Sequence, residues 1–95
     1  MKAIWKNTLI AQSENTVDFE GEIYFPASSL KKEFFRESPD RTFSAKKGNL
    51  MNFDLIVEGE MLANAASYVV APNDENAKCL KGLFNFSDEI KIISS

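Results

Sequence analysis

Apolar and polar residues alternate in short runs along this chain, and turn-forming residues separate the runs. Side chains that alternate with a period of two point to opposite faces of a β-strand. The pattern therefore predicts a mainly β protein of about seven or eight short, mostly antiparallel strands in a barrel- or sandwich-like arrangement, with two short helices. The expected strands cover residues 2–5, 8–12, 16–20, 23–25, 50–57, 60–62, 65–70 and a run beginning at 83, and residues 89–93 close the chain.

Turn residues separate the expected strands. Lys6-Asn7 is predicted to form a tight turn, and Gly21 permits a turn or a bulge. Glu58-Gly59 is expected to reverse the chain, as in a hairpin. Ser38-Pro39-Asp40-Arg41 is predicted to be a turn, because the proline presets the backbone of its second position.

Two short helices are expected between these strands. Pro26 ends a strand because it has no N–H for the ladder. Ser28 and Ser29 then offer capping oxygens for a short helix over residues 30–33. Residues 72–75 resemble a second helix start, with acidic side chains in the first turn, and this helix should end near Lys81-Gly82.

The longest apolar-rich run, residues 50–57, predicts a core strand. Met51, Phe53, Leu55 and Val57 share one face of it, and this face is wholly apolar. We therefore expect that face to point into the core. The other face carries Leu50, Asn52, Asp54 and Ile56.

Length and charge limit the class of protein. The 95 residues are expected to form a single domain, residues 1–95, because one core suffices for a chain of this size. The net charge of −3 argues against a nucleic-acid partner, which requires a strong basic field. The chain contains no histidine. Catalytic triads that need a histidine, zinc sites with histidine ligands and acid–base catalysis by histidine are therefore excluded.

The single cysteine, Cys79, has no partner for an internal disulfide and is typical of a reducing compartment. We find no signal-peptide pattern and no long apolar run, so a cytoplasmic protein without a membrane segment is expected. No cofactor is predicted. The partner is expected to be a small molecule or another protein, and the chain to be a monomer or a weak homo-oligomer.

Lys46-Lys47-Gly48 is open to two interpretations. Lysines beside a glycine suggest an anion site, but phosphate cradles usually open a helix and here a strand follows. The alternative is a turn with two solvated lysines. The surrounding residues 31–47 hold six of the eleven basic residues and three acidic ones, which gives this segment a charge of +3 and suits an acidic ligand or partner.

Several ordered elements resemble the domain of unknown function 427 family, which is sometimes labelled nucleotidyltransferase-like. They are MKAIW at residues 1–5, LIAQS at 9–13, EGEIYFP at 20–26, NAASYVVAP at 64–72 and LKGLFNF at 80–86. The resemblance extends over nearly the whole chain and implies a compact, mainly β domain with short helices. It implies no particular activity. The chain has neither the paired Asp-x-Asp nor the glycine-rich loop that nucleotidyl transfer would call for.

The family signature T-x-C-P-W-K-G aligns with residues 42–48 of this chain. Thr42, Lys47 and Gly48 match it, whereas cysteine, proline and tryptophan are replaced at residues 44–46. In the element at residues 64–72, Ser67 stands where the family has a tryptophan. If those aromatic side chains line a pocket in relatives, this chain lacks that stacking surface.

The sequence thus predicts a non-enzymatic ligand-binding or interaction module. Its candidate ligand-binding residues are Thr42, Lys47 and Gly48 of the signature, together with Tyr24 and Tyr68 from two of the family elements. No catalytic or metal-binding residue is predicted. The alternative is an enzyme acting on a small acidic or phosphorylated metabolite, with Lys47 as electrostatic group and Tyr24 or Tyr68 transferring a proton.

Overall fold

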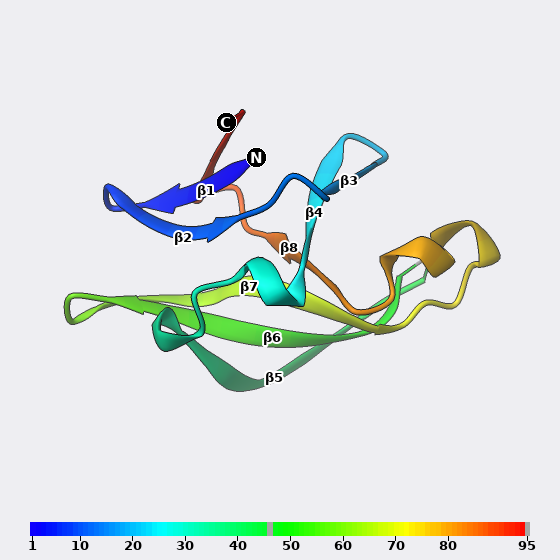
Figure 1. Cartoon of the computed structure of the whole chain (residues 1–95). Helices are drawn as coiled ribbons and strands as arrows, with labels where there is room; N and C mark the ends of the chain where they lie inside the picture. The colour runs from blue at the N-terminus through cyan, green and yellow to red at the C-terminus, as the bar shows by residue number, and fades with distance from the viewer. Residues whose placement is uncertain (46, 95) are drawn as a thin grey trace.

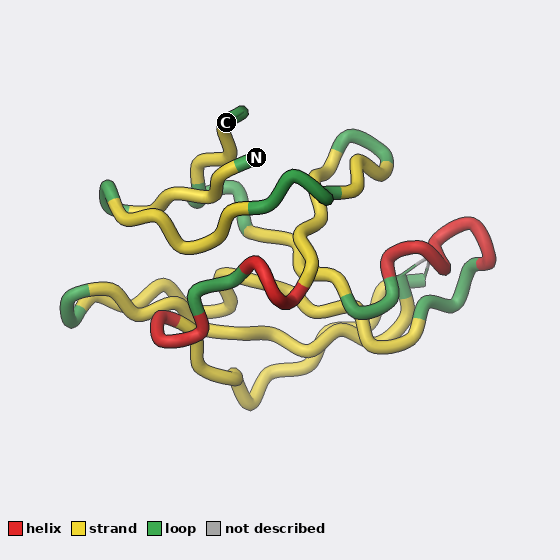
Figure 2. Tube along the Cα trace, in the orientation of Figure 1, coloured by secondary structure: helices red, strands yellow, loops and turns green. Residues whose placement is uncertain are grey.

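The computed structural model describes residues 1–45 and 47–94, and β-strands make up most of this part of the chain (Figure 1 and Figure 2). The prediction of a mainly β fold is confirmed. Over the described residues the strands are β1 (Lys2–Trp5), β2 (Thr8–Gln12), β3 (Val17–Phe19), β4 (Glu22–Pro26), β5 (Phe35–Ser44), β6 (Gly48–Val57), β7 (Glu60–Ala71), β8 (Leu83–Phe86) and β9 (Lys91–Ile93). The helices are short 3-10 turns: η1 (Ala27–Ser29), η2 (Lys32–Phe34) and η3 (Glu75–Leu80).

The strands form two antiparallel sheets. The large sheet has the order β3-β4-β8-β7-β6-β5, and the small sheet has the order β2-β1-β9. Figure 1 shows the small sheet as a second layer beside β6 and β7, with both ends of the chain in it. Among the described strands neither sheet closes on itself, so the fold is layered and is not a closed barrel.

Two-residue turns join three of the hairpins. Lys6-Asn7, Glu20-Gly21 and Glu58-Gly59 all have positive φ at both positions, between 49° and 83°. Two successive left-handed residues match the right-handed twist of the flanking strands, as in type I′ turns. The predicted turns at Lys6-Asn7 and Glu58-Gly59 are confirmed, as is the turn that Gly21 allows.

The predicted turn at residues 38–41 is wrong, because these residues lie within β5. Glu37 faces Phe53 and Arg41 faces Met51, so three residues of β5 lie opposite one residue of β6. Pro39 cannot donate to the ladder, and an edge strand accommodates such a residue in a bulge. The chain therefore bends here but does not reverse.

A second bulge joins the predicted strands 60–62 and 65–70 into the single strand β7. Leu62 pairs with Leu55 and Ala66 with Phe53, so three residues of β7 lie opposite Asp54. The extra residues include Asn64, which has a φ of +52°. Asparagine tolerates this conformation better than most residues, which explains the polar interruption in the apolar pattern.

The prediction of one short helix over residues 30–33 is wrong in its extent. Two 3-10 turns, η1 and η2, lie on either side of Leu30, which is buried and forms a bridge with Ala11 of β2. The Ser29 hydroxyl donates to the Pro26 carbonyl at 2.6 Å and caps no helix. The second expected helix is confirmed as η3, and Asp74 caps it by accepting from the Asn76 N–H at 2.8 Å.

The large sheet is covered on both faces. Toward the small sheet, Leu55 and Val57 are buried and Phe53 packs against them, in line with the predicted core face of residues 50–57. The opposite face is not left to solvent. Leu50 joins a second buried cluster with residues of β4, β7 and η3: Tyr24, Val69, Ala77 and Leu80.

Candidate functional site

Lys47 and Tyr24, two of the predicted site residues, lie together. The Lys47 Nζ is 3.0 Å from Glu22 Oε1 and 5.2 Å from the centre of the Tyr24 ring. The Tyr24 hydroxyl donates to the same Glu22 oxygen at 3.4 Å. One carboxylate therefore neutralises the lysine and accepts from the tyrosine.

The environment keeps both groups protonated near neutral pH. Burial raises the pKa of Tyr24, and the positive charge of Lys47 only partly opposes this effect. For Lys47, burial lowers the pKa, but the hydrogen bonds and charges of Tyr24 and Glu22 outweigh burial and leave the pKa raised. A lysine available as a general base would need a lowered pKa.

Gly48 and Thr42 have local structural partners. Gly48 has a φ of +77°, and a Cβ atom there would lie 1.9 Å from the Ala71 carbonyl oxygen. Thr42 Oγ1 accepts from Asn52 Nδ2 at 2.9 Å. Both residues help to join β5, β6 and β7 at the end where Lys47 lies.

Tyr68 lies on the other face of the large sheet. Tyr24 is paired with Asn85, and Asn85 with Ser67, so these three side chains share one face. Tyr68 follows Ser67 and therefore points to the opposite face, where its ring lies 5.0 Å from that of Phe84. The structure brings Lys47 to Tyr24 and separates both from Tyr68.

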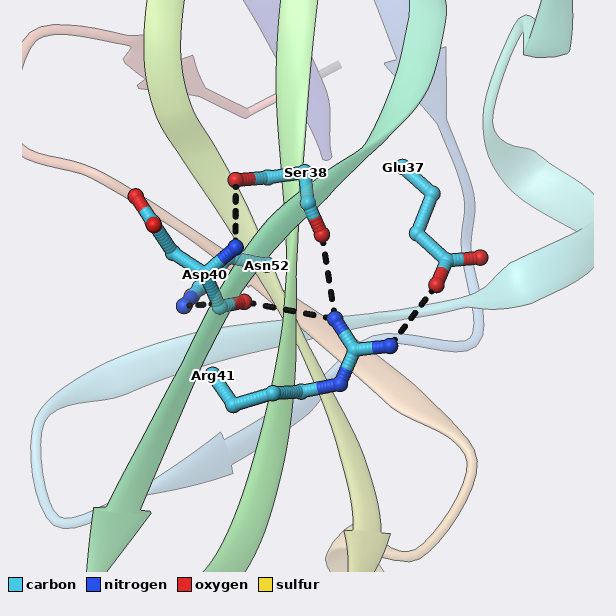
Figure 3. A network of polar contacts seen from close by, with 5 residues as sticks. All are labelled: Glu37, Ser38, Asp40, Arg41 and Asn52. Carbon is cyan, nitrogen blue, oxygen red and sulfur yellow. Dashed lines mark hydrogen bonds and ion pairs between the residues drawn. The ribbon is translucent and has the colours of Figure 1, made fainter.

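A polar network that the sequence did not indicate holds the bulge of β5 (Figure 3). Arg41 donates to Glu37 Oε2 at 2.8 Å and to the Ser38 carbonyl at 3.0 Å. Asp40 N–H donates to Ser38 Oγ at 3.1 Å, and Asn52 Nδ2 donates to the Asp40 carbonyl at 3.3 Å. Because these groups satisfy one another, the network explains the bulge and needs no ligand.

An apolar cavity of about 330 Å³ lies between the η1–η2 segment and the middle of the large sheet, on the face that carries Tyr68. We call it the Tyr68 cavity. Its lining residues are Ala27, Leu30, Lys32, Phe35, Met51, Phe53, Tyr68 and Phe84. Aromatic rings make up its floor, and the Phe53 and Phe84 rings lie 5.3 Å apart.

The sequence identified one residue of this cavity, Tyr68, as a candidate site residue. Phe53 was expected to face the core with the other apolar residues of its strand, and Phe84 was placed in the strand that begins at residue 83. The signal that relates them is their alignment across β6, β7 and β8, in which Tyr68 pairs with both Met51 and Phe84. That alignment depends on strand pairing, which a single sequence does not give.

The cavity has few polar groups. Within residues 1–45 and 47–94, the Tyr68 hydroxyl makes no hydrogen bond, and no three acidic or cysteine side chains gather to hold a metal ion. In this same part of the chain no helix is long and apolar enough to cross a membrane. The lining offers apolar contact together with two residues that carry a polar group, Tyr68 and Lys32.

The fold and this cavity define a small, layered antiparallel β domain with an apolar pocket on one sheet face. The chain belongs to the family described as domain of unknown function (DUF427), whose model matches residues 1–93 and carries a nucleotidyltransferase label in its short name. The resemblance seen in the sequence is thereby confirmed. The comparison with curated proteins finds no match.

Proposed function

We propose that this protein is a non-enzymatic module that binds a small, largely apolar molecule in the Tyr68 cavity. The observation that carries the proposal is a cavity of about 330 Å³ that is lined by four aromatic residues and bordered by the η1–η2 segment. Ligand sites in proteins are typically concave and apolar with a few polar groups, and begin at about 300 Å³. The volume and the lining of this cavity meet that description.

Tyr68 supplies the polar group that would orient such a molecule. Its ring packs on Phe84, and its hydroxyl makes no hydrogen bond within the described part of the chain. A tyrosine with a packed ring and a free hydroxyl can contact an apolar ligand and also direct one hydrogen bond. Of the five residues proposed from the sequence, the proposal retains Tyr68.

The other four residues support the proposal less well. Lys47 and Tyr24 share Glu22, Thr42 accepts from Asn52, and Gly48 has no side chain. In the alternative, an enzyme acting on an acidic metabolite, Lys47 would supply positive charge and Tyr24 would transfer a proton, but the charge of Lys47 is already balanced by Glu22 and burial raises the pKa of Tyr24. We therefore propose binding without catalysis.

Titration of the ¹⁵N-labelled protein with indole, a neutral aromatic probe, tests the proposal. We expect amide shifts to concentrate on Phe53, Tyr68 and Phe84. The Ala27→Phe variant should abolish them, because Ala27 lines the cavity and the added ring would fill it. Ser28→Phe adds the same ring at the next, exposed position and should leave binding unchanged.

Two results would overturn this proposal. One is the absence of shifts at the cavity residues in the unaltered protein. The other is a set of shifts that Ala27→Phe and Ser28→Phe leave equally intact, which would place the probe elsewhere. Dispersed amide spectra of both variants confirm beforehand that they are folded.

A further inference from the structure

Lys32 is the one charged residue in the lining of the Tyr68 cavity among the described residues. It lies in η2 and is exposed, and no carboxylate in the described part of the chain pairs with it. Glu33, the next residue, does not line the cavity. The cavity therefore combines an apolar floor with one unpaired positive charge.

Two other basic residues near the sheet, Arg41 and Lys47, differ from Lys32 in this respect. Arg41 lines a neighbouring cavity that shares Met51, but it is paired with Glu37 at 2.8 Å. Lys47 is paired with Glu22 at 3.0 Å. These charges are already balanced by the protein, whereas the charge of Lys32 is free to attract a ligand.

We propose that the molecule bound in the Tyr68 cavity is an organic anion: an apolar body with one terminal acidic group, held at Lys32. This inference rests on the proposed function, because it assumes that the cavity is occupied. An apolar body suits the aromatic floor, and an acidic end needs a charged partner at the apolar boundary. A carboxylate and a phosphate ester share this chemistry.

The cavity also limits the size of the anion. A volume of about 330 Å³ equals the space of roughly eleven water molecules at about 30 Å³ each. An apolar body of the size of a single aromatic ring with a short chain fits within this volume.

Probes that share an apolar body and differ in their terminal group separate the contribution of the charge to binding from that of the apolar body. We would titrate the ¹⁵N-labelled protein with 4-phenylbutyrate, the neutral 4-phenylbutanamide and 3-phenylpropyl phosphate, and follow Phe53, Tyr68 and Phe84. The carboxylate should bind about fivefold more tightly than the amide, as expected for a partly exposed ion pair. Comparing the phosphate ester with the carboxylate shows which acidic group the site prefers. Tighter binding of either anion than of the neutral amide supports the inference.

Substitutions of Lys32 identify the source of the preference. Lys32→Gln should reduce anion binding to the level of the amide, and Lys32→Glu should favour 4-phenylbutylamine instead. Lys31→Gln makes the same change in charge one residue away, outside the cavity lining, and should change the preference less than twofold. Because Lys31 and Lys32 are both exposed, these variants are expected to fold normally.

The outcomes distinguish the two proposals. Equal binding of acid and amide, with no effect of Lys32→Gln, would overturn the inference and leave the proposed function standing, provided that indole still binds. An equal effect of Lys31→Gln and Lys32→Gln would also overturn it, since general electrostatic attraction would then suffice. If no probe, indole included, perturbs the cavity residues, the proposed function itself fails.

Discussion

Among the four glycines, Gly48 is the one at which an added Cβ atom would lie closest to another atom of the protein. It opens β6 beside the last residue of β7, and its φ of +77° lies in the left-handed region. A Cβ atom would lie 1.9 Å from the Ala71 carbonyl oxygen and 3.0 Å from the Ala71 carbonyl carbon, both of which are backbone atoms. The match of Gly48 to the family signature therefore has a packing explanation.

We predict that Gly48→Ala lowers the free energy of unfolding much more than Gly59→Ala. Gly59 has a similar φ of +82° but no atom within 4 Å of an added Cβ, so its substitution costs only the backbone strain of about 1–2 kcal/mol. The clash at Gly48 should add about 1–3 kcal/mol. Urea unfolding of both variants measures the difference, and equal losses would contradict the packing explanation.

The cluster of Lys47, Tyr24 and Glu22 predicts a loss of stability in alkaline solution. Burial raises the pKa of Tyr24 above its usual 10.0. Burial lowers the pKa of Lys47, but the hydrogen bonds and charges of Tyr24 and Glu22 raise it above its usual 10.5. Both folded-state pKa values are raised, so the associated stability is complete below the unfolded values and is lost as the pH rises through the folded ones.

Urea unfolding measured between about pH 9 and pH 12 should show this loss. The Tyr24→Phe variant should lose less stability over the same interval, because one of the two titrating groups is absent. The comparison uses the change with pH within each protein, so the cost of the substitution itself cancels. A loss of the same size in both proteins would contradict the prediction.

At the scale of elements, the two bulges of β5 and β7 meet at β6. Asn52 lies opposite the bulge of β5, donates to Asp40 and Thr42 and accepts from Ser67 Oγ at 3.0 Å. Asp54 lies opposite the bulge of β7 and accepts from the Asn64 N–H at 2.9 Å. These polar side chains of β6 replace the ladder bonds that the bulges interrupt.

Asn52→Ala should therefore destabilise the protein by about 2–4 kcal/mol, because it removes three hydrogen bonds from a buried position. Asn49→Ala is the matched control on the same strand. Asn49 is exposed, and its replacement should change stability by less than about 0.5 kcal/mol. Thermal or urea unfolding measures both, and similar effects of the two variants would show that the network contributes little.

The elements also show what the sequence can predict. Lys6-Asn7 and Glu58-Gly59 defined their hairpins, because two-residue turns are encoded locally. Pro39 was equally compatible with a turn and with an edge bulge, and only the pairing of β5 with β6 decides between them. Tyr24 and Tyr68 could not be assigned to opposite faces, since this depends on β8 lying between β4 and β7.

At the scale of the whole molecule, one sheet separates two buried clusters. The first cluster lies between the two sheets and includes Leu55 and Val57, and Trp5 of β1 packs against it. The second lies on the far face of the large sheet, where Leu80 of η3 packs with Tyr24 and Val69. Because adjacent residues of the same strands contribute to both clusters, we expect the two clusters to unfold together.

The single tryptophan, Trp5, allows this cooperativity to be measured. Leu80→Ala removes a fully buried side chain from the second cluster and should cost about 2–5 kcal/mol. We predict that the fluorescence of Trp5 and the circular dichroism of the whole chain show coincident urea transitions, which the substitution shifts by the same amount. Ile56→Val, a smaller change at a half-buried position of β6, should shift both transitions together but less. If Leu80→Ala shifted the circular dichroism while the transition of Trp5 stayed in place, the clusters would be independent, and the shared sheet would not couple them.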